Sequence, residues 1–226
     1  GMYLSKEMVE EISKNPDKLT LKWEKKDITI LFSDIAWFTS ISEKMQPQEL
    51  FDFLNEYLSQ MTKILTKNSW TLDKYIWDAV MWFFNAPLDI ENPEYKACLT
   101  AIEQQEKLIE LNKKWQSLNL PKIEVRIWIH SWETMHWNLW SIWERLNYTV
   151  IWDNVNLASR LEWICKYYWV KIVISETVSE KIKSDFIIRE LDQIEVKWKD
   201  KAVRIFELIW LKTNKKTLIE YYKYIK

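Results

Sequence analysis

Two aspartates stand where apolar, strand-like segments end. Asp34 closes the run ITILFSD, and Asp78 follows the run KYI after one intervening residue, Trp77. Carboxylate oxygens are ligands that Mg²⁺ prefers, and the ion is usually held by one or two of them together with substrate phosphates. Separation along the chain cannot show that the two aspartates meet. By itself, the pattern favours solvated aspartates at strand ends.

Four other polar residues have types that could act chemically. Asn156 and Arg160 are an i, i+4 pair in a helical segment, so they share one helix face, which the pattern alone explains as a solvated face. His130 and His136 lack the spacing of a helical ligand pair, and we expect structural histidines. The sequence contains no Walker loop, nucleophile elbow or dinucleotide-binding fingerprint.

Size and composition restrict the class of protein. The chain has 226 residues and a mass of 27.7 kDa, which suits one large domain or one domain with a short extension. Its 32 basic and 33 acidic residues give a net charge of −1, so we expect no nucleic-acid partner bound through phosphate neutralisation. Cys98 and Cys165 form no CxxC motif, which predicts neither a zinc site nor a disulfide framework.

The sequence also bears on where the protein is found. No apolar run approaches the roughly 18 residues of a membrane span. The N-terminal segment GMYLSKEMVEEISKN is charged from Lys6 onward, so it lacks the apolar stretch of a signal peptide. We therefore expect a cytoplasmic protein, or the cytoplasmic part of a membrane-anchored one.

The contents of glycine and tryptophan are abnormal. The chain has one glycine and sixteen tryptophans, whereas an average glycine content of about 7% predicts roughly sixteen glycines. Several tryptophans stand at expected turns or helix ends, where glycine is favoured: Trp77, Trp163, Trp169 and Trp198. We hypothesise that most are glycines in the natural protein, whose source reads the codon UGA as glycine. Trp115 is left open, because it follows Leu108 and Leu111 at helical spacing.

Hydrophobic periodicity predicts an alternation of strands and helices. The expected elements are a helix over residues 3–15, a strand over 28–34, a helix from Pro47, strands over 70–76 and 79–85, a helix from Pro93 to about Trp115, a strand over 123–129, a strand pair over 134–152, a helix over 153–167, a strand over 171–175, a helix over 176–184, strands near 186–196 and 202–209, and a helical tail. The order predicts an α/β fold: a ferredoxin-like βαββαβ core with appended strands and helices, in which helices pack against one mixed sheet.

Once tryptophan is read as glycine, long segments resemble the motifs of class III nucleotide cyclases of the bacterial sensor-linked type. The segments are FSDIAWFTSISEKM, LDKYIWDAVMWFFNAP, RIWIHSWE, NLWSIWERLNYTVIWDNVNLASRLEWI and VKWKDKAVRIFEL. They follow the order and spacing of the family from about residue 25 to 210. The resemblance implies an N-terminal helix and linker over 1–24, a catalytic domain over 25–211 and a C-terminal helical tail over 212–226.

The resemblance also implies a metal site. Asp34 and Asp78 match the two metal-binding aspartates of the family, and the backbone carbonyl of Ile35 matches a further metal contact. The implied cofactor is Mg²⁺ or Mn²⁺, with two ions in each site.

Family members are homodimers or pseudo-dimers with active sites between the subunits, so the resemblance implies that the other subunit completes each site. Lys74 and Thr149 match the pair that reads the purine. Asn156 matches the asparagine that orients the ribose, and Arg160 the arginine that faces the reacting phosphate. Looser matches, to the triphosphate contacts, are Arg145 and Lys197.

The implied activity is that of an adenylyl cyclase, which converts ATP to cyclic AMP and pyrophosphate in signal transduction. An ammonium at position 74 can donate to N1 of adenine, which favours ATP over GTP. A sensor domain upstream in a longer chain is a further implied partner. The alternative hypothesis is a catalytically silent cyclase-like domain that serves as a dimerisation or nucleotide-sensing module.

Overall fold

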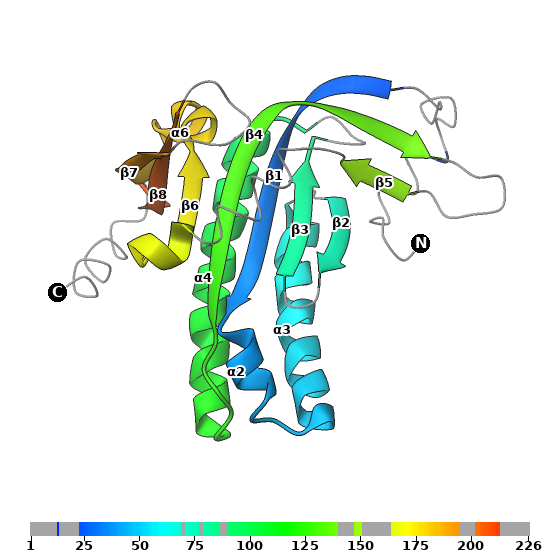
Figure 1. The fold of residues 1–226 in the computed structure, drawn as a ribbon, viewed down its shortest axis with the longest axis vertical. Helices are drawn as coiled ribbons and strands as arrows, with labels where there is room; N and C mark the ends of the chain where they lie inside the picture. The colour runs from blue at the N-terminus through cyan, green and yellow to red at the C-terminus, as the bar shows by residue number, and fades with distance from the viewer. Residues whose placement is uncertain are drawn as a thin grey trace.

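One mixed sheet with helices on it forms the body of the molecule, as the computed structural model shows (Figure 1). The structure describes residues 13, 23–68, 71–76, 79–85, 90–139, 147–150, 164–194 and 202–212. The strands are β1 (Trp23–Ala36), β2 (Thr71–Ile76), β3 (Ala79–Phe84), β4 (Glu124–Leu139), β5 (Asn147–Val150), β6 (Ile172–Ser175), β7 (Phe186–Ile194) and β8 (Val203–Leu211). The helices are α2 (Phe38–Ser42), α3 (Pro47–Lys67), α4 (Pro93–Ser117) and α6 (Glu176–Ile182).

The strand order confirms the predicted fold class. The eight-stranded sheet runs β2-β3-β1-β4-β6-β8-β7, with β5 paired to β4. The βαββαβ core consists of β1, α3, β2, β3, α4 and β4 in chain order. In this core β1 is antiparallel to both β3 and β4. The appended strands join through a parallel pairing of β4 with β6. One difference is that β4 is a single long strand where two separate strands were expected, over 123–129 and from 134.

The helices α3, α4 and α6 cover one face of the sheet with a continuous apolar core. Helix α3 begins at Pro47, whose missing N–H and fixed φ suit a first helical turn, and a capping box of Gln46 and Glu49 closes its start. Its buried stripe is Phe53, Tyr57, Met61 and Leu65. In the sequence, Leu50, Leu54 and Ile64 recur at helical spacing with Tyr57 and Met61, which predicts that all five share the buried face. In the structure, Leu50, Leu54 and Ile64 are only half-buried.

The opposite face of the sheet has its own, smaller core. Ile28, Ile30 and Phe32 of β1 lie there, next to Met81 of β3 and Trp128 of β4. Ile164 and Cys165, in the helical residues 164–168, cover this core from outside. Because side chains alternate along a strand, Asp34 continues the row of Ile30 and Phe32 and belongs to this second face.

Trp115 behaves as a true tryptophan. It is completely buried against Phe53, with ring centroids 4.5 Å apart, and its Nε1 donates a hydrogen bond of 3.0 Å to Glu56. Lys114 also contacts this carboxylate, and the hydrogen bonds from Lys114 and Trp115 lower the pKa of Glu56. Together these contacts tie α4 to α3.

Other tryptophans differ from the expectation that they stand at turns. Only Trp37 and Trp169 are tryptophans with a positive φ among the described residues, at 63° and 56°. Trp82 and Trp128 lie inside β3 and β4, fully buried. Trp77, Trp163 and Trp198 lie outside the described residues, as do nearly all of the predicted helix 3–15, most of the helix 153–167 and the tail.

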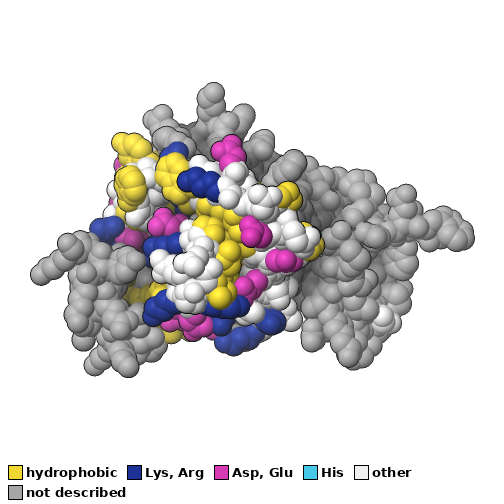
Figure 2. Space-filling model, turned by 90° about the horizontal axis from the view of Figure 1, so that it is seen from below, with side chains coloured by type: hydrophobic (Ala, Val, Ile, Leu, Met, Phe, Trp, Pro, Cys, Tyr) yellow, Lys and Arg dark blue, Asp and Glu magenta, His cyan; other side chains and the backbone are white. Residues whose placement is uncertain are grey.

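The surface of the described residues carries charges of both signs. Viewed from below, both basic and acidic side chains lie around a central apolar strip (Figure 2). None of the described helices combines the length and the apolar character that a membrane span requires.

Candidate active site

Asp34 lies near the end of β1, on the face of the sheet opposite α3 and α4. It is half-buried and sits directly between Ala79 of β3 and Arg126 of β4 in the antiparallel register. Ile35, whose carbonyl was predicted to contact a metal, is the next residue and its side chain is 2% exposed. The burial of Ile35 among core residues fixes the backbone that carries both predicted ligands.

Asp78 lies outside the described residues, but its immediate neighbour does not. Ala79 stands opposite Asp34 in the β1–β3 ladder, where paired Cα atoms are about 5 Å apart. This register brings the end of β1 next to the start of β3. Two carboxylates and a carbonyl supply the hard oxygen donors that Mg²⁺ and Mn²⁺ accept, so the residues fit a divalent ion. Among the described residues, no group of three or more His, Cys, Asp or Glu side chains could hold a metal.

Arg126 is a residue of this region that the sequence reasoning missed. It faces Asp34 across the β1–β4 ladder, and its guanidinium carbon lies 5.5 Å from the centroid of the Trp37 ring. An arginine beside the end of β1 puts a permanent positive charge next to the predicted metal ligands, where a polyphosphate would also lie. The sequence could have indicated this residue, because Arg126 is the one basic residue within the apolar strand 123–129.

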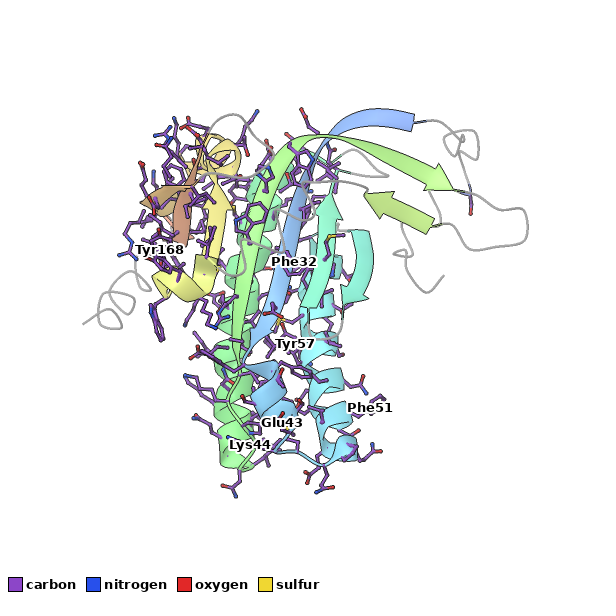
Figure 3. The ribbon with its side chains drawn as sticks, in the orientation of Figure 1. Phe32, Glu43, Lys44, Phe51, Tyr57 and Tyr168 are labelled. Atoms are coloured by element: carbon purple, nitrogen blue, oxygen red, sulfur yellow. The ribbon has the colours of Figure 1, made fainter. Side chains whose placement is uncertain are left out.

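Tyr57 approaches the same strand end from the helical side of the sheet. Figure 3 shows it between α3 and the lower part of β1. The side chain is 2% exposed, and burial raises the pKa of the Tyr57 hydroxyl well above its usual range. A hydrogen bond with Ser33 acts in the opposite direction, and the negative charge of Asp34 raises the pKa further. The hydroxyl is therefore neutral at working pH.

The predicted purine-reading residues lie on neighbouring strands. Lys74 stands opposite Met81 in the β2–β3 ladder, directly after an irregularity in β2. Thr149 stands opposite Trp137 on the β4–β5 ribbon. Strands β2 and β5 are in contact, so the two strands that carry positions 74 and 149 are neighbours within one subunit.

The remaining predicted site residues lie outside the described residues: Asn156, Arg160, Arg145 and Lys197. His136 lies within β4. His130 is completely buried, with its Nδ1 2.7 Å from Ser175 Oγ, as a structural histidine would be.

Comparisons with known proteins point to one family. Residues 21–210 match the family described as the Adenylate and Guanylate cyclase catalytic domain. An adenylate cyclase from Anabaena cylindrica is 38% identical over 188 residues, which are 80% of this chain and 36% of that protein. The solved adenylyl cyclase CyaB from P. aeruginosa has a TM-score of 0.74 at 32% identity, covering 84% of this chain and 96% of that chain. The guanylyl cyclase Cya2 has a TM-score of 0.76 at 28% identity, covering 86% and 97%.

The chain belongs to the adenylate and guanylate cyclase catalytic domain family, the class III nucleotide cyclases. It spans little more than a third of the Anabaena protein, although it spans nearly all of the two solved chains. The similar proteins include both adenylyl and guanylyl cyclases. Membership of the family therefore does not determine whether the substrate carries adenine or guanine; that choice depends on residues of the site.

Proposed function

We propose that this domain, over residues 25–211, is an adenylyl cyclase that converts ATP to cyclic AMP and pyrophosphate. The observation that carries the proposal is the register that sets Asp34 opposite Ala79, next to Asp78. In the reaction the ribose 3′-oxygen attacks the α-phosphorus in line, a new O–P bond forms, and the bond to the leaving pyrophosphate breaks. Holding both ends of one molecule in register supplies much of the rate.

The metal site is proposed to consist of the carboxylates of Asp34 and Asp78 and the carbonyl of Ile35. When bound, two divalent ions would activate the attacking oxygen and neutralise the polyphosphate. Asp34 is half-buried beside Arg126, so its carboxylate oxygens are positioned by two flanking strands. The guanidinium of Arg126 is expected to attract the polyphosphate toward these ligands.

The remaining catalytic groups act on the ribose and the reacting phosphate. Asn156 is proposed to orient the ribose. Arg160 would spread the negative charge that develops on the phosphate, for which a planar, permanently charged guanidinium is suited. Arg145 and Lys197 are proposed contacts of the triphosphate.

Selection of adenine is proposed to rest on Lys74 and Thr149. An ammonium can donate to N1 of adenine, and a hydroxyl can accept from N6, whereas guanine presents donors at N1 and N2. The contact between β2 and β5 supports a joint role, because it makes the strands that carry both positions neighbours within one subunit. Each unsatisfied buried group costs about 1–3 kcal/mol, enough for a preference of roughly tenfold or more.

We also propose a homodimer whose two sites each combine the metal ligands of one subunit with Lys74, Thr149, Asn156 and Arg160 of the other. In Figure 1 the β4–β5 ribbon, which carries Thr149, projects away from the helices α4 and α6. Such a projecting ribbon is suited to reach a second subunit. A cytoplasmic location and a sensor elsewhere in a longer chain complete the proposal.

The natural protein is proposed to carry glycine at most tryptophan positions. Trp37 and Trp169 support this, since a positive φ is costly for any residue with a Cβ and free for glycine. The indole nitrogens of Trp128 and Trp132 are buried with no hydrogen-bond partner among the described residues, which glycine would avoid. Trp115 is the exception, because its ring is completely buried and its Nε1 donates a hydrogen bond to Glu56. We call the protein with glycine at every tryptophan position except 115 the glycine form.

Two experiments test these proposals. The glycine form is incubated with ATP or GTP in Mg²⁺ and in Mn²⁺, and products are identified by mass spectrometry. Cyclic AMP should be the main product, and no cyclic nucleotide under any condition would favour the silent module. Peptide mass spectrometry of the natural protein should find glycine at positions 37 and 169, and tryptophan there would refute the codon hypothesis.

A further inference from the structure

The beginning of β4 has a neighbouring strand on one side only, within the described part of the chain. Strand β1 pairs with β4 from Glu124 onward, whereas β6 pairs with it only from Ile127 onward. Residues 123–125 therefore have one row of backbone groups that no described strand reaches. Ile123 and Val125 are buried, so water cannot satisfy their backbone groups freely.

Two carboxamide side chains of helix α4 satisfy this row. Asn112 Nδ2 donates a hydrogen bond of 2.8 Å to the carbonyl of Ile123, and Asn112 Oδ1 accepts one of 2.9 Å from the N–H of Ile123. Gln105 Nε2 donates a hydrogen bond of 2.8 Å to the carbonyl of Val125. Positions 105 and 112 are seven residues apart, so they lie on one face of the helix. Helix α4 thus takes the place of the missing strand.

Both amides lie in a contact whose other members are mainly apolar. Gln105 and Asn112 are each 8% exposed, between α4 and the sheet. Burying a carboxamide is costly unless it is hydrogen-bonded, and an apolar side chain of the same size would pack there without that cost. A carboxamide, however, carries the same donor and acceptor as a peptide group and can pair with the backbone of a strand. The two amides therefore fix the backbone of β4, which apolar packing alone does not do.

The hydrogen bond from Gln105 meets the sheet beside the candidate active site. Val125 stands opposite Ile35 in the β1–β4 ladder, and the next residue, Arg126, stands opposite Asp34. A shift of the Val125 backbone would therefore move Arg126 and disturb the pairing of both proposed metal ligands of β1. The backbone that Asn112 holds, at position 123, lies just beyond the end of this ladder.

We propose that Gln105 is a positioning residue, which fixes Val125 and thereby holds Arg126 and the metal-binding end of β1 in place. This inference rests on the proposed metal site. It adds to that site a support from helix α4, on the face of the sheet opposite Asp34. Groups that orient metal ligands without touching the metal typically change metal affinity by 10–100-fold. Because Gln105 acts through the strand pairing, we expect the lower end of that range.

The test compares three buried amides of α4 in the glycine form. Gln105→Met and Asn112→Leu each remove the hydrogen bonds and keep the approximate size of the side chain. Gln104→Met is the matched control, because Gln104 is also buried but its Nε2 has no hydrogen-bond partner among the described residues. Mn²⁺ binding is measured by the EPR signal of the free ion, with an ATP analogue that lacks the 3′-hydroxyl. Urea unfolding measures the stability of each variant.

Metal binding and stability should respond differently to these changes. Gln105→Met should weaken Mn²⁺ binding about tenfold, whereas Asn112→Leu and Gln104→Met should leave it nearly unchanged. Asn112→Leu should lose more stability than Gln105→Met, because it removes two hydrogen bonds instead of one. A merely structural role of Gln105 would instead make the loss of Mn²⁺ binding follow the loss of stability.

The outcomes separate this proposal from the one on which it rests. If Asp34→Ala leaves Mn²⁺ binding intact, the metal site itself is wrong. If Asp34→Ala abolishes binding while Gln105→Met binds normally, only the positioning role is wrong. Weaker Mn²⁺ binding by Asn112→Leu than by Gln105→Met also overturns it. Should Gln105→Met not fold, Gln105→Asn decides by the same tenfold criterion, because its amide is one methylene shorter and cannot span the same distance to Val125.

Discussion

Tryptophan restored at position 169 of the glycine form should lower its stability by about 1 kcal/mol. In the structure Trp169 has a φ of 56°, and a residue with a Cβ pays roughly 1–2 kcal/mol in this left-handed region. Its side chain is 90% exposed, so burial offsets almost none of that cost. For a chain of this size, about 1 kcal/mol corresponds to a shift of about 2–4 °C in Tm.

Trp115→Gly in the same protein should have a much larger effect. The ring is completely buried, and truncating a buried tryptophan costs about 3–5 kcal/mol. Glycine inside a helix adds about 1 kcal/mol, and Glu56 loses the hydrogen bond from Nε1. Tryptophan restored at position 37 should be nearly neutral. Its φ of 63° is unfavourable, but its ring gains Arg126 at 5.5 Å and Lys166 at 4.9 Å.

Urea unfolding of the glycine form and the three variants measures these differences. Our reasoning predicts a small loss for tryptophan at 169, almost no change at 37, and a loss of at least about 4 kcal/mol for Trp115→Gly. It is refuted if tryptophan at 169 stabilises the protein, or if Trp115→Gly is tolerated. Either result would mean that the left-handed backbone and the buried indole do not distinguish glycine positions from tryptophan positions.

Three further predictions concern the site and the α3–α4 contact. Asp78→Ala and Arg160→Ala should each be inactive alone, and a mixture that exchanges subunits should regain part of the activity; no rescue would place the site within one chain. Lys74→Glu combined with Thr149→Cys should erode or reverse the preference for ATP in kcat/KM, whereas equal values for ATP and GTP in the parent would exclude base reading by this pair. Hydrogen bonds from α4 lower the pKa of Glu56 from 4.5, so its contribution to stability is present above that value and is lost as the pH falls through the lowered pKa. Glu56→Gln should therefore reduce the loss of stability below pH 4.5 in acid unfolding, and an unchanged profile would contradict this.

The sequence predicted the core of the fold well, because periodicity reports which face of each element is buried. The strand at Asp34 and the helix from Pro47 were expected and are observed. The short helix α2 was not predicted, because the five residues Phe38–Ser42 are too few to show a helical repeat; only Phe38 and Ile41 pack, partly buried, against the core. The stripe of α3 was misjudged because Leu50 and Leu54 are as apolar as Phe53, and only packing decides which one faces the sheet.

The candidate site was less accessible to sequence reasoning. Residue types drew attention to Asp34 and Asp78, and the resemblance to class III cyclases gave them a metal role. That Asp34 lies opposite Ala79, the residue after Asp78, depends on the β1–β3 register, which no local pattern encodes. Arg126 escaped notice because it becomes a neighbour of Asp34 only when β4 pairs with β1.

Metal-dependent formation of cyclic AMP tests the central claim most directly. The glycine form and its Asp34→Ala variant are each incubated with ATP, with Mg²⁺, with Mn²⁺ and with EDTA, and cyclic AMP and pyrophosphate are quantified. We predict both products in equal amounts from the parent protein with either ion, none with EDTA, and none from Asp34→Ala, whose far-UV circular dichroism should match the parent. Cyclic AMP formed in EDTA, or at the parent rate by Asp34→Ala, would contradict the proposed active site.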